Sequence, residues 1–377
     1  MSTLTPAVRR YLGVAAVGAA LAVGVAACGS SDKNSGSGSS NGASSSTLSQ
    51  AQAVLAQGAR RPSEITVSTP INKPIPTGKK IAFISCGTSQ CQLQGKIIGE
   101  AASHLGWTSQ TIATDGSPTQ IQNGFTTALR NGVDAVIINA VTRETIAKQL
   151  AQAKAKGVAY IGCCSTDSVG DGYLYNTSTP EQNETIGKYL AAAIVADSKG
   201  KANTLYVNIP AFTILASLGK SFEKDYKAYC PSCAYSTMDV ALPQLGDAPN
   251  KIVSYLRSHP DVNYVALSVT DALGTGLPAA LKAAGLTKVK IVGQGGDPTA
   301  FQAVAQGQIL ALVPFDYYDV DYQMVDALAR HFAGVPIEQT PPPRWLLTKD
   351  NLPSDYTKLF PNVPDYQTKF LKLWGKA

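Results

Sequence analysis

The sequence is poor in charge and in the side chains of most catalytic sites. Only 15% of its 377 residues are charged, and only three are histidine. His104, His259 and His331 are each expected on or at the end of a helix, so no Ser-His-Asp or zinc constellation can be assembled. The sequence also has no GxSxG motif and no phosphate-binding loop. These absences make an enzyme the most distant alternative and predict no cofactor.

Clusters of basic residues are also missing. The formal net charge is +6, and it is spread thinly along the chain. No helix-turn-helix pattern precedes Lys79, so nucleic acid is not an expected partner. The acidic cluster Asp316, Asp319 and Asp321 lacks the register of a calcium loop, and no metal site is predicted.

Cys28 follows a segment with the features of an export signal. Arg9 and Arg10 precede an apolar run that ends in Val-Ala-Ala-Cys. A positively charged start, an apolar stretch and small residues at its end are typical of a cleaved signal peptide, here residues 1–27. A cysteine at the cleavage point resembles a bacterial lipobox, so Cys28 is the expected lipid attachment site. An uncleaved membrane anchor over residues 11–28 and a chance alanine-rich start are the alternatives.

Residues 28–78 are expected to form a flexible tether with a short helix. Residues 29–47 are almost entirely small and polar, a composition that is flexible and cannot be buried. Residues 49–61 have helical spacing and would form the short helix, which either docks on the body or extends the tether. A lipid on Cys28 would then hold an exported body at the outer face of the cell membrane.

Six cysteines remain besides Cys28, and an even number in an exported protein favours disulfides. They are Cys86, Cys91, Cys163, Cys164, Cys230 and Cys233. The first two flank a short loop and would pair locally. The adjacent pair needs a strained peptide to bond to each other, so their pairing with the first loop stays open. The last two form a CxxC that is expected to staple a turn, with redox chemistry as the alternative.

From residue 78 onward, short β-branched runs alternate with segments of helical spacing. In the first module, strands are predicted at 80–85, 108–113, 134–139 and 159–164, and helices at 92–105, 119–130 and 145–156. In the second, strands are predicted at 205–209, 236–240, 264–268, 290–293 and 310–313, and helices near 180–198, 214–229, 247–258, 272–284 and 299–306. This order predicts an α/β protein with two doubly wound parallel-sheet domains and a ligand site at the carboxyl ends of the strands.

Several of these segments resemble one protein family. They are Ile81–Trp107, Val133–Asn139, Lys156–Ile161, Val269–Gly274, Ile291–Pro298 and Leu347–Asn351. In this order, over about residues 79–351, they resemble the type I periplasmic binding proteins of the ribose-binding kind. The resemblance implies an N-terminal lobe of residues 79–177 plus 316–345 and a C-terminal lobe of residues 178–315 plus 346–377.

The resemblance also implies a function. Three hinge crossovers would join the lobes near residues 175–178, 314–317 and 344–346. Closure of the lobes around a small molecule would deliver it to an ABC permease, with the protein acting as a monomeric solute-binding lipoprotein. A lipoprotein that senses the solute and reports to a membrane receptor would share this fold and pocket.

Twelve residues fall at or beside the positions where the resemblance implies ligand contacts. They are Cys86, Gln90, Gln92, Asn139, Cys164, Asp167, Phe212, Thr270, Asp271, Gln294, Phe315 and Tyr317. Charged groups expected of sugar binders are absent: Cys164 and Ser165 replace an Asp-Arg pair, and Gly295 replaces an Asp. A buried hydroxyl left unpaired costs about 1–3 kcal/mol. The expected solute is therefore neutral and partly apolar or aromatic, or a sugar held by amides and stacking.

Other roles are open for some of these side chains. Phe212, Phe315 and Tyr317 also fit as core aromatics beneath the hinge. Asp271 also fits as a helix cap. Beyond the family core, residues 353–377 are rich in aromatics and are expected to pack as a short helix against the C-terminal lobe.

Overall fold

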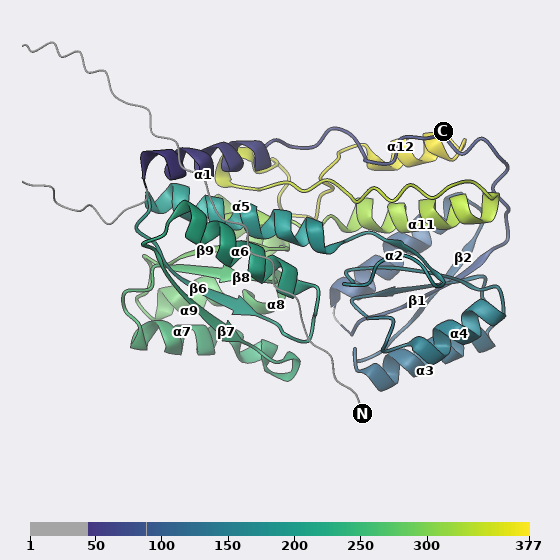
Figure 1. Ribbon diagram of the computed structural model, residues 1–377, viewed down its shortest axis with the longest axis horizontal. Helices are drawn as coiled ribbons and strands as arrows, with labels where there is room; N and C mark the ends of the chain where they lie inside the picture. Colours follow the sequence, from purple (N-terminus) through teal and green to yellow (C-terminus); the bar gives the residue numbers. More distant parts are fainter. Residues whose placement is uncertain (1–43, 88) are drawn as a thin grey trace, which may run out of the picture. The chain divides into compact units, whose positions relative to one another are not determined.

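The computed structural model describes residues 44–87 and 89–377, which contain two parallel sheets (Figure 1). The predicted signal peptide, Cys28 and the start of the expected tether lie outside the described residues. Among the described helices, none is both long and apolar enough to cross a membrane. We call the part built on the first sheet the N-lobe and the part built on the second sheet the C-lobe.

The N-lobe sheet has the strand order β2-β1-β3-β4-β5. Its strands are β1 (Lys80–Ile84), β2 (Thr108–Ile112), β3 (Ala135–Asn139), β4 (Ala159–Cys163) and β5 (Tyr173–Asn176). Its helices are α2 (Ser89–His104), α3 (Pro118–Arg130), α4 (Ala147–Ala155), α11 (Tyr317–Ala333) and α12 (Tyr366–Leu373). Since α2 and α11 pack on one face and α3 and α4 on the other, the central strands are buried on both sides and read as continuous apolar runs.

The C-lobe sheet has the strand order β10-β9-β8-β6-β7. Its strands are β6 (Asn203–Asn208), β7 (Ala234–Asp239), β8 (Tyr264–Leu267), β9 (Lys290–Gln294) and β10 (Ile309–Val313). Its helices are α1 (Ser45–Gly58), α5 (Pro180–Ser198), α6 (Leu215–Tyr229), α7 (Ala248–Ser258), α8 (Thr270–Leu273), α9 (Leu277–Ala283) and α10 (Pro298–Ala305), with short 3-10 turns at Leu242–Asp247 and Lys349–Asn351. Helix α1 lies along α5, which packs closely on α6 (Figure 1).

Each sheet has a point where the strand order reverses. In the N-lobe, β1 lies between β2 and β3, and in the C-lobe, β6 lies between β7 and β8. The connections that leave such a strand diverge to opposite sides, which opens a crevice at its carboxyl end. The two-domain α/β fold predicted from the sequence is confirmed, and these crevices are where a ligand site is expected.

Within residues 44–87 and 89–377, the chain passes between the lobes five times. The three predicted crossovers are present, after β5, after β10, and between Gln339, which donates to an N-lobe carbonyl, and Trp345 in the C-lobe core. A fourth passage follows α1, because Ile65 enters the N-lobe core. A fifth leads from Phe360, packed on the C-lobe, to Val363 in the N-lobe core.

Two expectations about the ends of the chain are wrong. The segment 44–78 is no free tether, because α1 packs on α5 and apolar side chains of residues 65–71 are buried in the N-lobe. The C-terminal segment packs on the C-lobe only as far as Phe360. Beyond it, Phe370 and Trp374 are buried in the N-lobe core, where the Trp374 indole donates to Asp326 at 2.8 Å.

The helix predicted over 272–284 is also interrupted. Gly276 has φ +80° and Pro278 follows it, so the segment divides into α8 and α9. Proline has no N–H to continue the first helix, and it is favoured in the first turn of the next one. The break leaves α8 as a single turn, from which the Asp271 side chain points toward the N-lobe.

Candidate functional site

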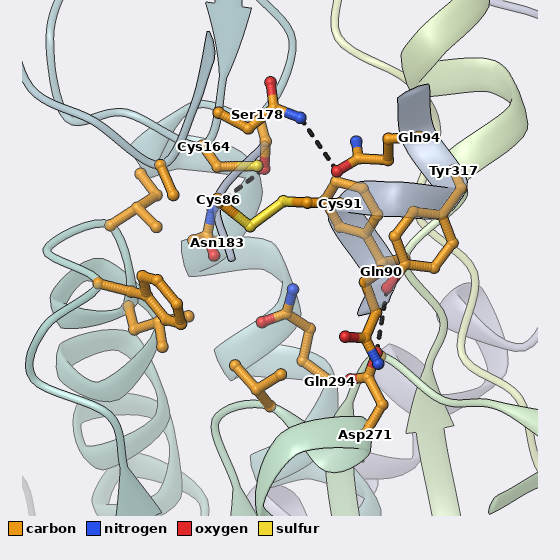
Figure 2. A pocket seen from close by; sticks show the side chains of 18 residues that line it. Cys86, Gln90, Cys91, Gln94, Cys164, Ser178, Asn183, Asp271, Gln294 and Tyr317 are labelled. Carbon is orange, nitrogen blue, oxygen red and sulfur yellow. Dashed lines mark hydrogen bonds between the residues drawn. A yellow bond between two sulfur atoms is a disulfide. The ribbon is translucent and has the colours of Figure 1, made fainter. Parts of the chain in front are cut away.

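A cavity of about 120 Å³ lies between the carboxyl ends of the two sheets (Figure 2). That is several times the roughly 10–15 Å³ that one water requires, so the cavity has room for a small molecule. Both lobes and the passages between them line it. The lining residues are Cys86, Gln90, Cys91, Gln94, Asn139, Ala140, Cys164, Ser178, Asn183, Phe212, Ile214, Leu215, Val269, Asp271, Gln294, Gly295, Phe315 and Tyr317.

Two amide side chains on the N-lobe wall are linked to a buried carboxyl. Asn139 ends β3, and its Nδ2 donates to Oε1 of Gln94 at 3.0 Å. Gln94 lies on α2, and its Nε2 donates to Oδ1 of Asp321 on α11 at 3.0 Å. All three side chains are buried. Among the described residues, none forms a hydrogen bond with the Oδ1 atom of Asn139.

Asp271 is a C-lobe carboxyl that accepts hydrogen bonds from the N-lobe. The Tyr317 hydroxyl, on α11, donates to its Oδ2 at 3.0 Å, and the Gln90 side chain on α2 also hydrogen-bonds to it. Burial raises the pKa of Asp271, and these hydrogen bonds oppose that rise. Gly295 leaves the space the carboxyl needs, since a Cβ there would lie 2.6 Å from Oδ1. Asp271 therefore joins the two lobes directly, rather than capping α8 from outside.

Two disulfides contribute cysteines to the N-lobe wall. Cys86–Cys91, shown in Figure 2, closes the loop between β1 and α2, as the sequence predicts. Cys163–Cys164 joins adjacent residues at the end of β4. Cross-pairing between these two sites, which the sequence left open, does not occur. Cys164 reaches the cavity in a left-handed conformation with φ +63°.

The third disulfide lies apart from the cavity. Cys230–Cys233 forms a disulfide that closes the turn after α6. Its two cysteines pack with the C-lobe core. In the described part of the chain, Cys86, Cys91 and Cys164 are therefore the only disulfide-bonded cysteines that line the cavity.

The C-lobe wall is mainly apolar. Phe212, Ile214 and Leu215 come from the turn that leads into α6, and Val269 precedes α8. Phe315 lies at the passage before α11 and packs against Tyr317, with ring centres 5.0 Å apart and ring planes tilted by 55°. Among the described residues that line the cavity, none is Lys, Arg or His. A molecule held there meets amides, sulfur and hydrocarbon more than charge.

The structure brings nine of the twelve predicted ligand residues to this cavity. They are Cys86, Gln90, Asn139, Cys164, Phe212, Asp271, Gln294, Phe315 and Tyr317. Phe212 and Phe315 are only partly buried, and each faces the cavity as well as the core.

The other three predicted residues lie elsewhere. Gln92 is exposed on α2, on a different side of the helix from Gln90 and Gln94. Asp167 accepts hydrogen bonds from the Arg143 N–H at 2.6 Å and the Ser165 hydroxyl at 2.9 Å, so it shapes the loop after β4. Thr270 is buried against Gly293, where an added Cβ would come within 2.2 Å of its Oγ1, and it borders a separate hollow.

Sequence reasoning missed three polar residues on the wall. Gln94 was detectable, because it lies one helical turn beyond Gln90 and therefore on the same face. Ser178 and Asn183 come from the first passage and the start of α5, where the Asn183 amide donates to the Ser178 hydroxyl at 3.4 Å. No sequence pattern marks these two, because they reach the cavity only through the angle between the lobes.

The described residues hold no group of three or more His, Cys, Asp or Glu side chains that would bind a metal ion. The buried carboxyls of Asp316 and Asp319, at the start of α11, lie near Arg344 instead. Burial raises the pKa of Asp316 to about 6, against the opposing effects of three backbone N–H donors and Arg344. Arg344 is partly buried and donates to the Ser178 hydroxyl at 2.9 Å.

Residues 81–335 match the family described as periplasmic binding protein domain. No curated protein is significantly similar in sequence. Many solved structures share the fold. One is an ABC transporter solute-binding protein from Agrobacterium vitis with bound allitol, 22% identical, with a TM-score of 0.66 over 73% of this chain and 97% of the other.

Two further structures illustrate the range of the similarity. A 5-methylthioribose transporter solute-binding protein from Thermotoga lettingae, in complex with 5-methylthioribose, is 20% identical, with a TM-score of 0.68 over 82% of this chain and 95% of the other. An ABC sugar transporter subunit from Rhodobacter sphaeroides is 21% identical, with a TM-score of 0.65 over 73% of this chain and 99% of the other.

Proposed function

Because the chain belongs to the periplasmic binding protein family, a family of solute-binding transport proteins rather than enzymes, we propose that it captures a neutral, partly apolar small molecule for an ABC importer. The observation that carries this proposal is the chemistry of the cavity wall. Amides of the N-lobe face apolar C-lobe side chains across the cavity, and none of the described lining residues is a cation. A solute bound there touches both lobes only when they are closed, so binding favours closure.

Solutes of intermediate polarity suit this wall best. A hydroxyl that loses water needs a hydrogen-bond partner, and amides such as Asn139 and Gln294 supply a few of these. The wall formed by Phe212, Ile214 and Leu215 supplies only apolar contact. A sugar that carries an apolar substituent, such as the 5-methylthioribose named for the Thermotoga lettingae protein, or a hydroxylated aromatic compound, combines both requirements.

The same proposal includes an exported protein held at the outer face of the cell membrane by lipid on Cys28. The lipobox-like segment supports it. Expression in a bacterium that processes lipoproteins should give a mature protein that begins at Cys28 and carries the added mass of the lipid. The Cys28→Ser variant should lack that mass and appear in the soluble extracytoplasmic fraction. A wild-type protein of unmodified mass would contradict the anchor.

The solute class is tested by native mass spectrometry of the freshly purified protein, followed by thermal unfolding with a panel of compounds. A solute at a hundredfold excess over its Kd adds about 2.7 kcal/mol of stability, which raises the Tm measurably. We expect Tm to rise with aromatic or alkylated neutral compounds. If Tm rises only with free pentoses and hexoses, the cavity is an ordinary sugar site and this part of the proposal is wrong.

A further inference from the structure

The three-residue chain from Asp321 through Gln94 to Asn139 runs in one direction. The Asp321 carboxyl on α11 accepts a hydrogen bond from the Gln94 amide, and the Gln94 carbonyl accepts one from the Asn139 amide. Both donor–acceptor distances are 3.0 Å. This chain of hydrogen bonds ends at Asn139 Oδ1, which has no hydrogen-bond partner among the described residues. Asn139 is only 3% exposed. Asn139 and Gln94 both line the cavity, and Figure 2 shows Gln94 on its wall.

The direction of this chain depends on Asp321. The two ends of an amide side chain are nearly equal in shape, so a Gln-Asn pair alone can be placed either way round. A carboxylate oxygen only accepts, which forces the Nε2 of Gln94 toward Asp321. The Gln94 carbonyl must then face Asn139, and the Asn139 carbonyl must face the cavity.

An ionised Asp321 carboxyl forces this direction, and a protonated one is compatible with it when the proton lies on Oδ2. Burial raises the pKa of its carboxyl, and the hydrogen bond from Gln94 opposes the rise. A proton held on Oδ2, which has no hydrogen-bond partner, leaves Oδ1 free to accept from Gln94.

We propose that Asp321 is a positioning residue that makes Asn139 present a hydrogen-bond acceptor to the solute, so that the solute must carry a donor at that point. This inference rests on the proposed solute-binding function. It deepens that function by assigning one chemical feature of the solute. Asp321 does not line the cavity and acts only through Gln94.

The opposite lobe carries a matching acceptor. Gln294, at the end of β9, also lines the cavity and is only 9% exposed. Its Oε1 atom has no hydrogen-bond partner in the described part of the chain. A solute that satisfies both atoms has two donors, such as hydroxyl or N–H groups, placed to reach both lobes. An anionic end at Asn139 Oδ1 would face an oxygen and is excluded. The solute therefore carries a donor toward each lobe and no anionic group at Asn139.

The positioning role is tested on the solute-free protein by NMR. The side-chain NH2 signal of Asn139, assigned by its loss in Asn139→Asp, should exchange slowly with water because it is buried and bonded to Gln94. In Asp321→Asn the chain can run either way, and we expect this exchange to become about tenfold faster, in line with the loss of one hydrogen bond. Gln94→Leu, which removes the middle of the chain, should have the same effect.

Asp319→Asn is the matched control. It changes a buried acidic residue on the same helix that is not bonded to Gln94. We expect it to leave the Asn139 exchange rate unchanged. An Asn139 signal that exchanges rapidly in the wild type, or that responds equally to Asp319→Asn, would overturn the proposal.

The requirement for a donor is tested with phenol and anisole, which differ by one hydroxyl donor. Phenol should perturb the Asn139 signals at about tenfold lower concentration than anisole. Equal or reversed potency would overturn the donor requirement. If neither compound perturbs any cavity residue, the apolar solute class under the proposed function fails, while the exchange rates still decide the role of Asp321.

Discussion

Asp271 shows how one residue connects binding and closure. Its carboxyl sits on the C-lobe, yet its hydrogen bonds come from Gln90 and Tyr317 on the N-lobe. Opening the lobes would break these bonds and return the carboxyl to water. The carboxyl fits only because residue 295 has no side chain, since an added Cβ would lie 2.6 Å from it.

Gly295→Ala should therefore weaken closure. The new methyl group would displace the Asp271 carboxyl, and φ at this position is +82°, which also disfavours alanine. We expect solute affinity to fall by about tenfold or more, corresponding to roughly 1–3 kcal/mol for a displaced hydrogen-bonded carboxyl. The affinity is measured by isothermal titration calorimetry with a solute identified by mass spectrometry. Gly307→Ala is the control, because φ there is +72° with no atom near the added Cβ; an equal loss in both variants would contradict the steric argument.

Asp316 predicts a pH dependence of stability. Burial raises its pKa to about 6, above the value near 3.8 of an unfolded Asp. The folded state then binds more protons than the unfolded state between about pH 4 and 6, so the free energy of unfolding should fall as pH rises through this range. The loss should amount to at most about 3 kcal/mol.

The measurement for Asp316 is chemical unfolding of the wild type and of Asp316→Asn across this pH range. Titrating groups distant from Asp316 cancel in the difference between the two proteins. The variant should lose stability overall, because the Asp316 carboxyl accepts from the backbone N–H groups of Asp319 and Asn362. Its stability should nevertheless fall less steeply from pH 4 to 6. Parallel curves would refute the raised pKa.

At the scale of elements, strands and their carboxyl ends were the most predictable part. Buried strands such as Ile81–Ile84 are continuous apolar runs, which distinguishes them from the amphipathic helices around them. Parallel strands also place the residues that follow them at one edge of the sheet. This is why Asn139 and Gln294 were found from sequence. Gln92 was misplaced because each step along a helix turns the side-chain direction by about 100°, so Gln92 points away from the face that carries Gln90 and Gln94.

Elements that owe their position to contacts distant in sequence were less predictable. Helix α12 has an apolar face that would fit either lobe, and contacts distant in sequence, among them the buried pairing of Trp374 with Asp326 and the packing of Phe370 on Tyr322, select the N-lobe. The pairing of Cys163 with Cys164 was left open for a similar reason. It depends on a left-handed backbone at Cys164, which composition and spacing do not reveal.

The disulfides should separate binding from stability. The Cys86–Cys91 bond holds the loop that leads into α2, and both sulfurs line the cavity. The Cys230–Cys233 bond closes a turn of similar length away from it. Because short loops gain little chain entropy on opening, we expect each double Cys→Ser variant to lose only about 2 kcal/mol of stability.

Solute affinity should respond differently in the two disulfide variants. Removing Cys86–Cys91 should lower it at least tenfold, because one wall of the cavity loses its fixed position. Removing Cys230–Cys233 should leave it unchanged. Thermal unfolding and calorimetric titration of both variants measure the two effects, and an equal loss of affinity in both would show that the first disulfide has no local role.

At the scale of the whole molecule, two additional passages lie together at the hinge. Arg61 Nε donates to the Asn362 carbonyl at 3.0 Å, and its guanidinium lies 5.0 Å from the centre of the Trp345 ring. The Asn362 N–H donates in turn to Asp316 at 2.7 Å. The segments before and after the family core therefore form a strap across the passages that must bend during closure.

Weakening this strap should make opening easier. In Arg61→Ala, the hydrogen bonds to the carbonyls of Pro361 and Asn362 are lost, and the backbone amide of Asn362 should exchange with solvent several-fold faster. The stability change should stay near 1 kcal/mol, because Arg61 is largely exposed. Distances between spin labels on the two lobes should broaden in the solute-free protein and narrow again when solute is bound. Arg60→Ala, at the exposed neighbouring residue, should change neither measurement. Broadening in both variants, or in neither, would show that lobe opening is governed by the three family crossovers alone.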